Sequence, residues 1–471
     1  MKITLTRGLT PLTALCAAML LGPTPRLRAT DGMNMEGYGP ISTAMGGTSM
    51  AFDNGTAGVI NNPATLGLQQ QANRLDLALG ILGPDIHATN PAGQSAKSES
   101  TAFYMPAVGY IHRSGDLAYG VAVFGQGGMG CQYNGNSWRG LGFGLENRSE
   151  VSVGRVIAPL AWNINDKLTI AVTADLVWAG MDLKMAMGGA QFNDLVNPQS
   201  QQFGRASGTI VQSFGQIMQQ MPAGTSVDYA YFDFSNSNPF TGRARGYGYA
   251  GSVGVLYRPT SSLSMGLTYH METELADLTT NSGSLAFQLN VPGMGAVAQK
   301  LVGSFRVHDF EWPAMLAGGI AWRPHPRWLL TADVREVYWS SVMRQFSMTF
   351  QAFGSASNGS FAGQSLDASL YQEWKDQTIV MVGAAYQASD RLTLRIGGNI
   401  GDNPVPDKYL NCLFPATVEN HLTAGFGWKI SPSATFDLSL TRGFESTQTN
   451  GSGITVSHSQ FNGQAMISLF F

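Results

Sequence analysis

From residue 74 onward the chain repeats one unit, about ten residues in which apolar and polar side chains alternate, followed by a connection. A period of two is typical of a β-strand with one apolar face. In 168–178, for example, Val172 and Leu176 share one phase, whereas Thr173 and Asp175 occupy the other. Fourteen segments show the pattern: 74–83, 101–113, 116–125, 149–164, 167–183, 245–258, 261–275, 310–323, 327–341, 376–388, 390–401, 417–430, 432–444 and 458–471.

The connections between these segments alternate in length. Short turns, such as 165–166 and 389–390, are separated by long irregular stretches, of which the longest are 184–244, 276–309 and 342–375. Short periplasmic turns opposite long extracellular loops are typical of outer-membrane barrels. The sequence therefore predicts an all-β fold, a 14-stranded antiparallel transmembrane β-barrel over residues 74–471.

Charged side chains within the predicted strands fall largely on one phase. A charge that faces lipid at mid-depth costs about 2–4 kcal/mol, so this phase is expected to line the lumen. There the charges pair with one another or bind a ligand carboxylate; if all are paired, a neutral hydrocarbon is the better substrate. The polar lumen candidates are Arg155, Asp175, Arg335, Arg395, Glu419 and His421.

Composition supports this class of protein. Only 13% of the 471 residues are charged, against roughly 25% in an average soluble domain, so an ordinary soluble protein is disfavoured. With 44% hydrophobic and 10% aromatic residues, disorder is disfavoured as well. Past residue 22 no apolar run reaches the roughly 20 residues of a membrane-spanning helix, which excludes a helical membrane protein.

The N-terminus predicts the compartment. Lys2 and Arg7 precede a short apolar stretch, and Ala29 ends a plausible cleavage site, so residues 1–29 are interpreted as a secretory signal peptide. Its removal leaves a net negative chain, which argues against nucleic-acid binding. Cys131 and Cys412 then remain; an oxidising compartment permits a disulfide, and the sequence leaves their pairing open. Metal-ligand spacing is absent from the sequence, so neither metal nor cofactor is expected.

Residues 30–73 do not alternate and are rich in Gly, Asn, Thr and Met, which suggests a plug in the lumen. Within them, Gly39-Pro-Ile-Ser-Thr-Ala-Met-Gly-Gly-Thr48 and then Asn62-Pro63-Ala64 resemble the N-terminal hatch of the FadL/TodX family. That family consists of outer-membrane transporters of long-chain fatty acids and other hydrophobic compounds. Glu311-Trp312-Pro313 and Asp402-Asn-Pro-Val-Pro406 extend the resemblance.

The resemblance implies a monomeric barrel closed by the hatch. Ligand is captured between extracellular loops, passes to a lumen pocket, and leaves sideways into the membrane through a kinked third strand, without an energy source. The expected hatch and gating residues are Gly46, Gly47, Asn62, Pro63 and Ala64. The terminal Phe471 resembles the signal read by the barrel assembly machinery.

The kink is expected at the end of the third predicted strand, at Phe124, Gly125, Gly127, Gly128 and Gly130. This run also matches G-x-G-x-x-G, so a dinucleotide site is an alternative. Because turn residues rather than a helix follow it, and parallel βαβ units are lacking in the pattern, glycines for a kinked strand are favoured over a cofactor site.

Two predicted extracellular stretches are apolar. Their residues either pack on each other as a lid or form the groove that first captures a hydrophobic ligand, with adaptable Met side chains. The groove candidates are Ile210, Phe214, Ile217, Met218, Phe287, Leu289, Met294 and Leu301.

Together these features predict a non-enzymatic protein of a Gram-negative-type outer membrane that takes up fatty acids or aromatic or aliphatic hydrocarbons by passive diffusion. The alternative is a structural or adhesive barrel without transport. An open hydrophilic porin is disfavoured by the plug, and an outer-membrane hydrolase stays a minor alternative because no nucleophile motif is present in the sequence.

Overall fold

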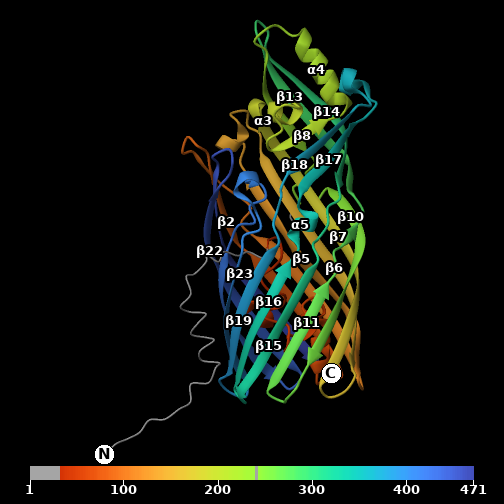
Figure 1. The fold of residues 1–471 in the computed structure, drawn as a ribbon, viewed down its shortest axis with the longest axis vertical. Helices are drawn as coiled ribbons and strands as arrows, with labels where there is room; N and C mark the ends of the chain where they lie inside the picture. The colour runs from red at the N-terminus through yellow and green to blue at the C-terminus, as the bar shows by residue number, and fades with distance from the viewer. Residues whose placement is uncertain (1–31, 239–241) are drawn as a thin grey trace, which may run out of the picture.

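The computed structural model describes residues 32–238 and 242–471, so the predicted signal peptide lies outside the described residues. All described strands join one antiparallel sheet of 23 strands, which curls into a tall barrel with the long loops gathered at its upper end (Figure 1). None of the helices within the described ranges has the length and apolarity needed to cross a membrane.

Of the described strands, fourteen run through the lower part of the wall, and nine more lie at the loop end, where two of them, β9 and β13, enter the wall. The lower wall consists of β1 (Asn73–Leu82), β4 (Phe103–Ser114), β5 (Leu117–Tyr133), β6 (Asn147–Asn163), β7 (Leu168–Gly188), β10 (Ala244–Tyr257), β11 (Leu263–His270), β15 (Met315–His325), β16 (Trp328–Val337), β19 (Gln377–Gln387), β20 (Leu392–Gly401), β21 (Asn420–Ser431), β22 (Ala434–Thr449) and β23 (Thr455–Phe470). The other strands are β2 (Pro84–Thr89), β3 (Ser95–Lys97), β8 (Gly204–Ser207), β9 (Ser226–Asp233), β12 (Glu274–Leu275), β13 (Leu278–Val291), β14 (Gly295–His308), β17 (Gln345–Ala352) and β18 (Ser365–Tyr371). The helices are α2 (Pro40–Thr43), α3 (Gly189–Val196), α4 (Thr209–Gln220), α5 (Trp339–Val342), η1 (Gly55–Val59), η2 (Pro63–Leu68), η3 (Trp138–Gly140), η4 (Ala356–Phe361) and η5 (Asp407–Tyr409).

The barrel closes where β1 pairs with β23, from Arg74 opposite Phe470 to Ile81 opposite Gly463. At the loop end, β9 pairs with β7 and β13 pairs with both β9 and β10, so these two strands join the circuit between β7 and β10. Counted through this insertion, the closed antiparallel barrel has 16 strands. The prediction of fourteen strands is therefore wrong.

The miscount arose in the predicted loops. Each of the fourteen alternating segments contains a wall strand, but 184–244 and 276–309 also hold β9, β13 and β14, and 342–375 holds β17 and β18. The apolar residues of 286–302 belong to the faces of β13 and β14, not to an irregular loop. Unpaired backbone N–H and C=O groups are costly when buried, so these segments pair with one another and prolong the wall.

Alternation along the strands sorts the side chains between lipid and lumen. Leu176 is 67% exposed on the outer face of β7, whereas its neighbour Asp175 is 4% exposed and points inward. Asp76 and Arg335 are likewise buried, each at 2%. Charged groups are thus removed from the lipid face of these strands, as the cost of lipid exposure requires.

Residues 32–72, called the inner segment below, lie inside the barrel and are almost entirely buried. They contain α2, η1 and η2 and contact wall strands on all sides. One carboxylate oxygen of Asp333 on β16 accepts hydrogen bonds from the backbone N–H groups of Ser49 (2.6 Å) and Met50 (3.0 Å). Asp76 on β1 accepts one from the N–H of Thr56 at 2.8 Å. Wall carboxylates therefore hold the inner segment by its backbone.

Replacing Asp333 by Ala should loosen the inner segment, because it removes two hydrogen bonds to a charged acceptor, together worth about 3 kcal/mol. We expect a lower thermal unfolding midpoint and a larger ionic current through the protein in a planar lipid bilayer. Asp390→Ala, at an exposed turn, is the matched control and should change neither. A wild-type current in the Asp333 variant would show that this carboxylate does not hold the plug.

Candidate transport path

The wall is incomplete between β4 and β5. Their pairing runs from Ser114 opposite Leu117 to Ala107 opposite Phe124 and then stops, although both strands continue. β5 instead follows β6, with a register shift between Gly125 and Gly127 that leaves Gln126 as an extra residue. Such a bulge bends a strand and interrupts its ladder. The predicted kink residues therefore lie along a real gap in the wall.

An apolar pocket lies in the wall at this gap. It comprises about 990 Å³ of empty space, part of it open to the surroundings of the barrel. Pro106, at the rim on β4, has no N–H to donate and is suited to an edge without a partner. The lining comes from β4 to β7 and includes Tyr104, Met105, Val123, Met129, Val153 and Trp178. We call it the lateral pocket.

On the inner side of the gap the inner segment takes the place of β4. Asn34 forms an isolated antiparallel bridge with Gly127, and the N–H of Gly128 donates to the carbonyl of Met33 at 3.0 Å. The indole N–H of Trp312 holds the Asn34 side chain at 2.7 Å. A Cβ on Gly127 would lie 2.2 Å from the Met33 oxygen, so only glycine permits this approach.

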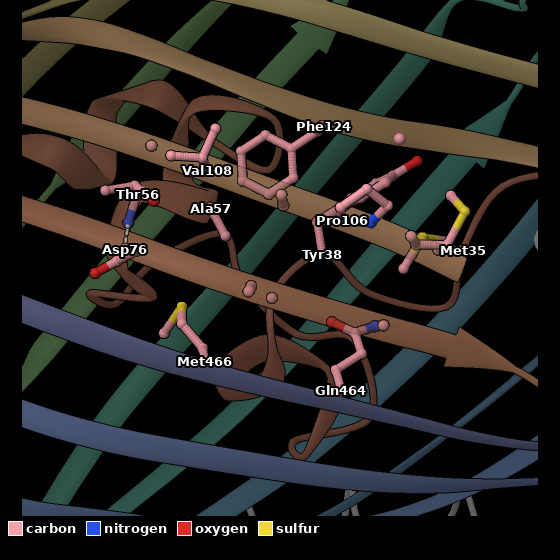
Figure 2. A pocket seen from close by; sticks show the side chains of 17 residues that line it. Met35, Tyr38, Thr56, Ala57, Asp76, Pro106, Val108, Phe124, Gln464 and Met466 are labelled. Atoms are coloured by element: carbon pink, nitrogen blue, oxygen red, sulfur yellow. Dashed lines mark hydrogen bonds between the residues drawn. The ribbon is translucent and has the colours of Figure 1, made fainter. Parts of the chain in front are cut away.

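A second pocket faces the lumen between the inner segment and β1, β4, β5 and β23 (Figure 2). Met35, Tyr38, Phe124 and Met466 surround a cavity of about 20 Å³ in this conformation. Met105, Pro106 and Gly125 line both this pocket and the lateral pocket. The two pockets therefore lie on opposite sides of one thin barrier. We call the inner one the luminal pocket.

A third apolar pocket, the upper pocket, lies nearer the loop end and has a cavity of about 20 Å³ in this conformation. Its lining includes Met33, Val151, Met181, Phe310, Phe346 and Phe414. Met33 thus borders this pocket and, through its carbonyl, the gap in β5. The first described residues of the inner segment therefore lie between the upper pocket and the gap.

The predicted groove residues come together, but as a packed cluster. Ring centroids of Phe214 on α4 and Phe287 on β13 are 5.5 Å apart in edge-to-face contact, and Phe192 on α3 lies 5.3 Å from Phe214. Buried with them are Ile210, Leu289 and Leu301, whereas Ile217 and Met218 are partly buried against the cluster. Met294, at the tip of the β13–β14 hairpin, stands apart and is 73% exposed.

The polar lumen candidates are mostly engaged with protein partners. Arg155 Nη1 lies 2.9 Å from Asp175 Oδ2, with both side chains 2% exposed. Arg395 pairs with Asp437 at 2.7 Å. His421 Nδ1 lies 2.8 Å from the amide oxygen of Asn399. Arg335 is buried, and Glu419 is half-buried at the start of β21.

The predicted hatch residues make contacts within the inner segment and, at Gly46, with the wall. Asn62 caps η2, accepting from the N–H of Ala64 at 3.1 Å, and donates to the carbonyl of Met50 at 2.7 Å; Pro63 occupies the first position of η2. The N–H of Gly46 donates to Thr423 Oγ1 at 2.8 Å. Gly47 has φ +89°, and a Cβ there would collide with the carbonyl of Glu36, 2.0 Å away.

Several residues at the gap were missed from the sequence: Met33, Asn34, Tyr38 and Gln126. The hydroxyl of Tyr38 donates to the Gln126 carbonyl at 2.5 Å. Trp312 was noted only as part of a motif. These residues meet across long sequence separations, so local alternation carried no signal for them. Within the described ranges, His, Cys, Asp and Glu side chains form no group of three or more that could hold a metal ion.

Comparison with known proteins identifies the family of this chain. The profile of the family described as "Outer membrane protein transport protein (OMPP1/FadL/TodX)" matches residues 32–465. The chain belongs to this family. It is accordingly an outer-membrane β-barrel protein, and the family and the structural neighbours are transport proteins instead of enzymes.

Solved structures of family members are similar over almost the whole chain. The toluene transporter TodX of P. putida is 28% identical, with a TM-score of 0.79, over 93% of this chain and 99% of that one. The toluene transporter TbuX of Ralstonia pickettii is also 28% identical, with a TM-score of 0.73, over 93% and 99%. An uncharacterized protein of Chlorobium limicola, encoded 5' of a phosphoenolpyruvate carboxykinase gene, is 44% identical over 97 residues, which are 20% of this chain and 46% of that protein. The match therefore spans about half the length of that relative.

Gly127→Ala should push the inner segment away from β5, because the added methyl group overlaps the Met33 carbonyl; overpacking of this kind costs about 1–3 kcal/mol. We expect faster hydrogen–deuterium exchange in peptides containing the Gly128 amide and a lower unfolding midpoint. Gly215→Ala on α4, where a Cβ meets nothing within 4 Å, is the control. Unchanged exchange in the Gly127 variant would refute the proposed contact.

Proposed function

We propose that this protein takes up neutral hydrophobic small molecules, with monoaromatic hydrocarbons as the favoured class, by passive diffusion across the outer membrane and lateral release into it. The observation that carries the proposal is the unpaired stretch of β4 and β5 with an apolar pocket on each side. Two solved relatives, TodX and TbuX, are toluene transporters.

The charges of the lumen support a neutral substrate over a carboxylate. Arg155 and Arg395 each lie within hydrogen-bond distance of an aspartate. Breaking a buried ion pair by taking one partner away costs about 3–5 kcal/mol, so a ligand carboxylate would have to replace an existing partner at that cost. In each of the three pockets apolar side chains outnumber polar ones, which suits a hydrocarbon; each pocket also has one acidic lining residue, Asp76, Asp309 or Glu150.

The path we propose begins at the loop end, where the Phe214–Phe287 cluster opens enough to admit a ligand. The molecule then enters the upper pocket, which must widen to hold it, passes Met33 and Asn34 as the inner segment shifts, and leaves through the lateral pocket. In this scheme Gly46, Gly47 and Asn62 anchor the rest of the hatch while its first residues move. The protein acts as a monomer, and the terminal Phe471, 68% exposed, is the feature that assembly machinery reads.

Filling the lateral pocket should slow uptake. Ser152 lines this pocket on β6, so we expect Ser152→Trp to reduce uptake of radiolabelled toluene by cells at least about fivefold, equivalent to roughly 1 kcal/mol in the barrier. Ala158→Trp, on the same strand, exposed and outside the pocket lining, is the matched control and should leave uptake unchanged.

Both variants should reach the outer membrane in equal amounts and keep the same heat-dependent mobility on gels. Uptake by Ser152→Trp at the wild-type rate would contradict lateral release. Toluene uptake no faster than in cells without the protein would instead favour a structural or adhesive barrel.

Charge discrimination supplies a separate test of substrate class. Because Arg155 and Arg395 are paired with aspartates, unlabelled p-xylene should compete with toluene uptake, whereas benzoate at the same concentration should not. Competition by benzoate equal to that by p-xylene would overturn the neutral-substrate proposal without affecting the lateral route.

A further inference from the structure

Two cysteines follow the predicted signal peptide, and the transport path uses neither. Cys131 lies on β5, one residue beyond the glycine run, and Cys412 lies in the 402–419 segment that joins β20 to β21. Both are buried, at 0% and 3% exposed, and both are free thiols in this structure. They are 281 positions apart in sequence, so only the fold can bring them together.

Two side chains join the backbones around these cysteines. The hydroxyl of Tyr133 contacts the Cys131 thiol and donates to the carbonyl of Cys412 at 2.9 Å. Ser149 Oγ accepts from the N–H of Cys131 at 3.3 Å and donates to the carbonyl of Leu413. Cys131 is therefore separated from the backbone of residues 412–413 by one hydroxyl group at each of two places, that of Tyr133 and that of Ser149.

We propose that Cys131 and Cys412 form a disulfide in the mature protein. Proteins exported across the inner membrane fold in an oxidising compartment, where neighbouring thiols are oxidised. The two thiols lose two protons and two electrons to the disulfide of a thiol oxidant, which is reduced to a dithiol, and one Sγ–Sγ bond forms.

The bond would join two parts of the transport path. Above the bulge, β5 has β6 as a partner but has lost β4, so one of its edges is held by few contacts. The 402–419 segment carries Phe414, which lines the upper pocket. The disulfide links the 402–419 side of the upper pocket to β5, the kinked strand. The proposal rests on the proximity of the two cysteines and is independent of the proposed substrate.

The test uses the full-length protein extracted from the outer membrane of cells with intact thiol oxidation. The protein is denatured with iodoacetamide without reductant, digested and analysed by mass spectrometry. We expect a peptide pair linked through Cys131 and Cys412 that separates on reduction. Recovery of both cysteines as alkylated thiols without prior reduction would overturn the proposal, whatever the result of uptake assays.

A second measurement needs no digestion. The boiled, non-reduced wild-type protein should migrate faster on a denaturing gel than the reduced protein, because the crosslink closes a large loop. Cys412→Ser and Cys131→Ser should each abolish this difference. Reductant should lower the thermal midpoint of the wild type by several degrees and leave that of the double Ser variant unchanged; an equal response of the two proteins would also count against the bond.

Discussion

The structure depends on one constraint, the need to satisfy every backbone N–H and C=O group where water is excluded. Closure of β1 on β23 removes the sheet edge that a membrane could not tolerate. The same constraint makes the gap between β4 and β5 informative. Where β4 ceases to pair, Pro106 lacks a donor and Asn34 of the inner segment supplies a partner for Gly127. The opening is thus closed by a few hydrogen bonds instead of a continuous ladder.

The inner segment has one part that is held strongly to the wall and another that is held weakly. Residues 46–62 are held by carboxylates and hydroxyls of the wall, of which Asp333 accepts two backbone N–H groups. At Met33 and Asn34 the contacts to β5 and Trp312 are neutral hydrogen bonds. Neutral bonds contribute about 1 kcal/mol each and charged ones about twice that, so the first residues are the easier part to displace. The passive route that we propose requires a barrier that thermal motion can cross.

The alternation of apolar and polar residues located the wall strands and the face on which each residue lies. It did so because a charge that faces lipid is costly at every position of a wall strand. The same rule failed at the loop end, where β9, β13 and β14 bury apolar side chains against other loops and were not predicted as strands. The strand count was wrong for that reason. The lumen ion pairs also depended on register: Arg395 and Asp437 meet across β20, β21 and β22, which no local pattern specifies.

By itself the sequence determined the class of protein, the lipid and lumen phases of its strands, the plug-like character of residues 30–73 and the position of the glycine-rich kink. These features follow from the spacing of residues that are close in sequence, because contact with lipid and the pleat of the strand constrain every residue of the wall. Only the tertiary structure decided that β9 and β13 enter the wall, that Met33 and Asn34 close the gap beside Gly127, and that Cys131 faces the backbone of Cys412. Each of these joins residues far apart in the chain, and their contact is set by barrel closure and register.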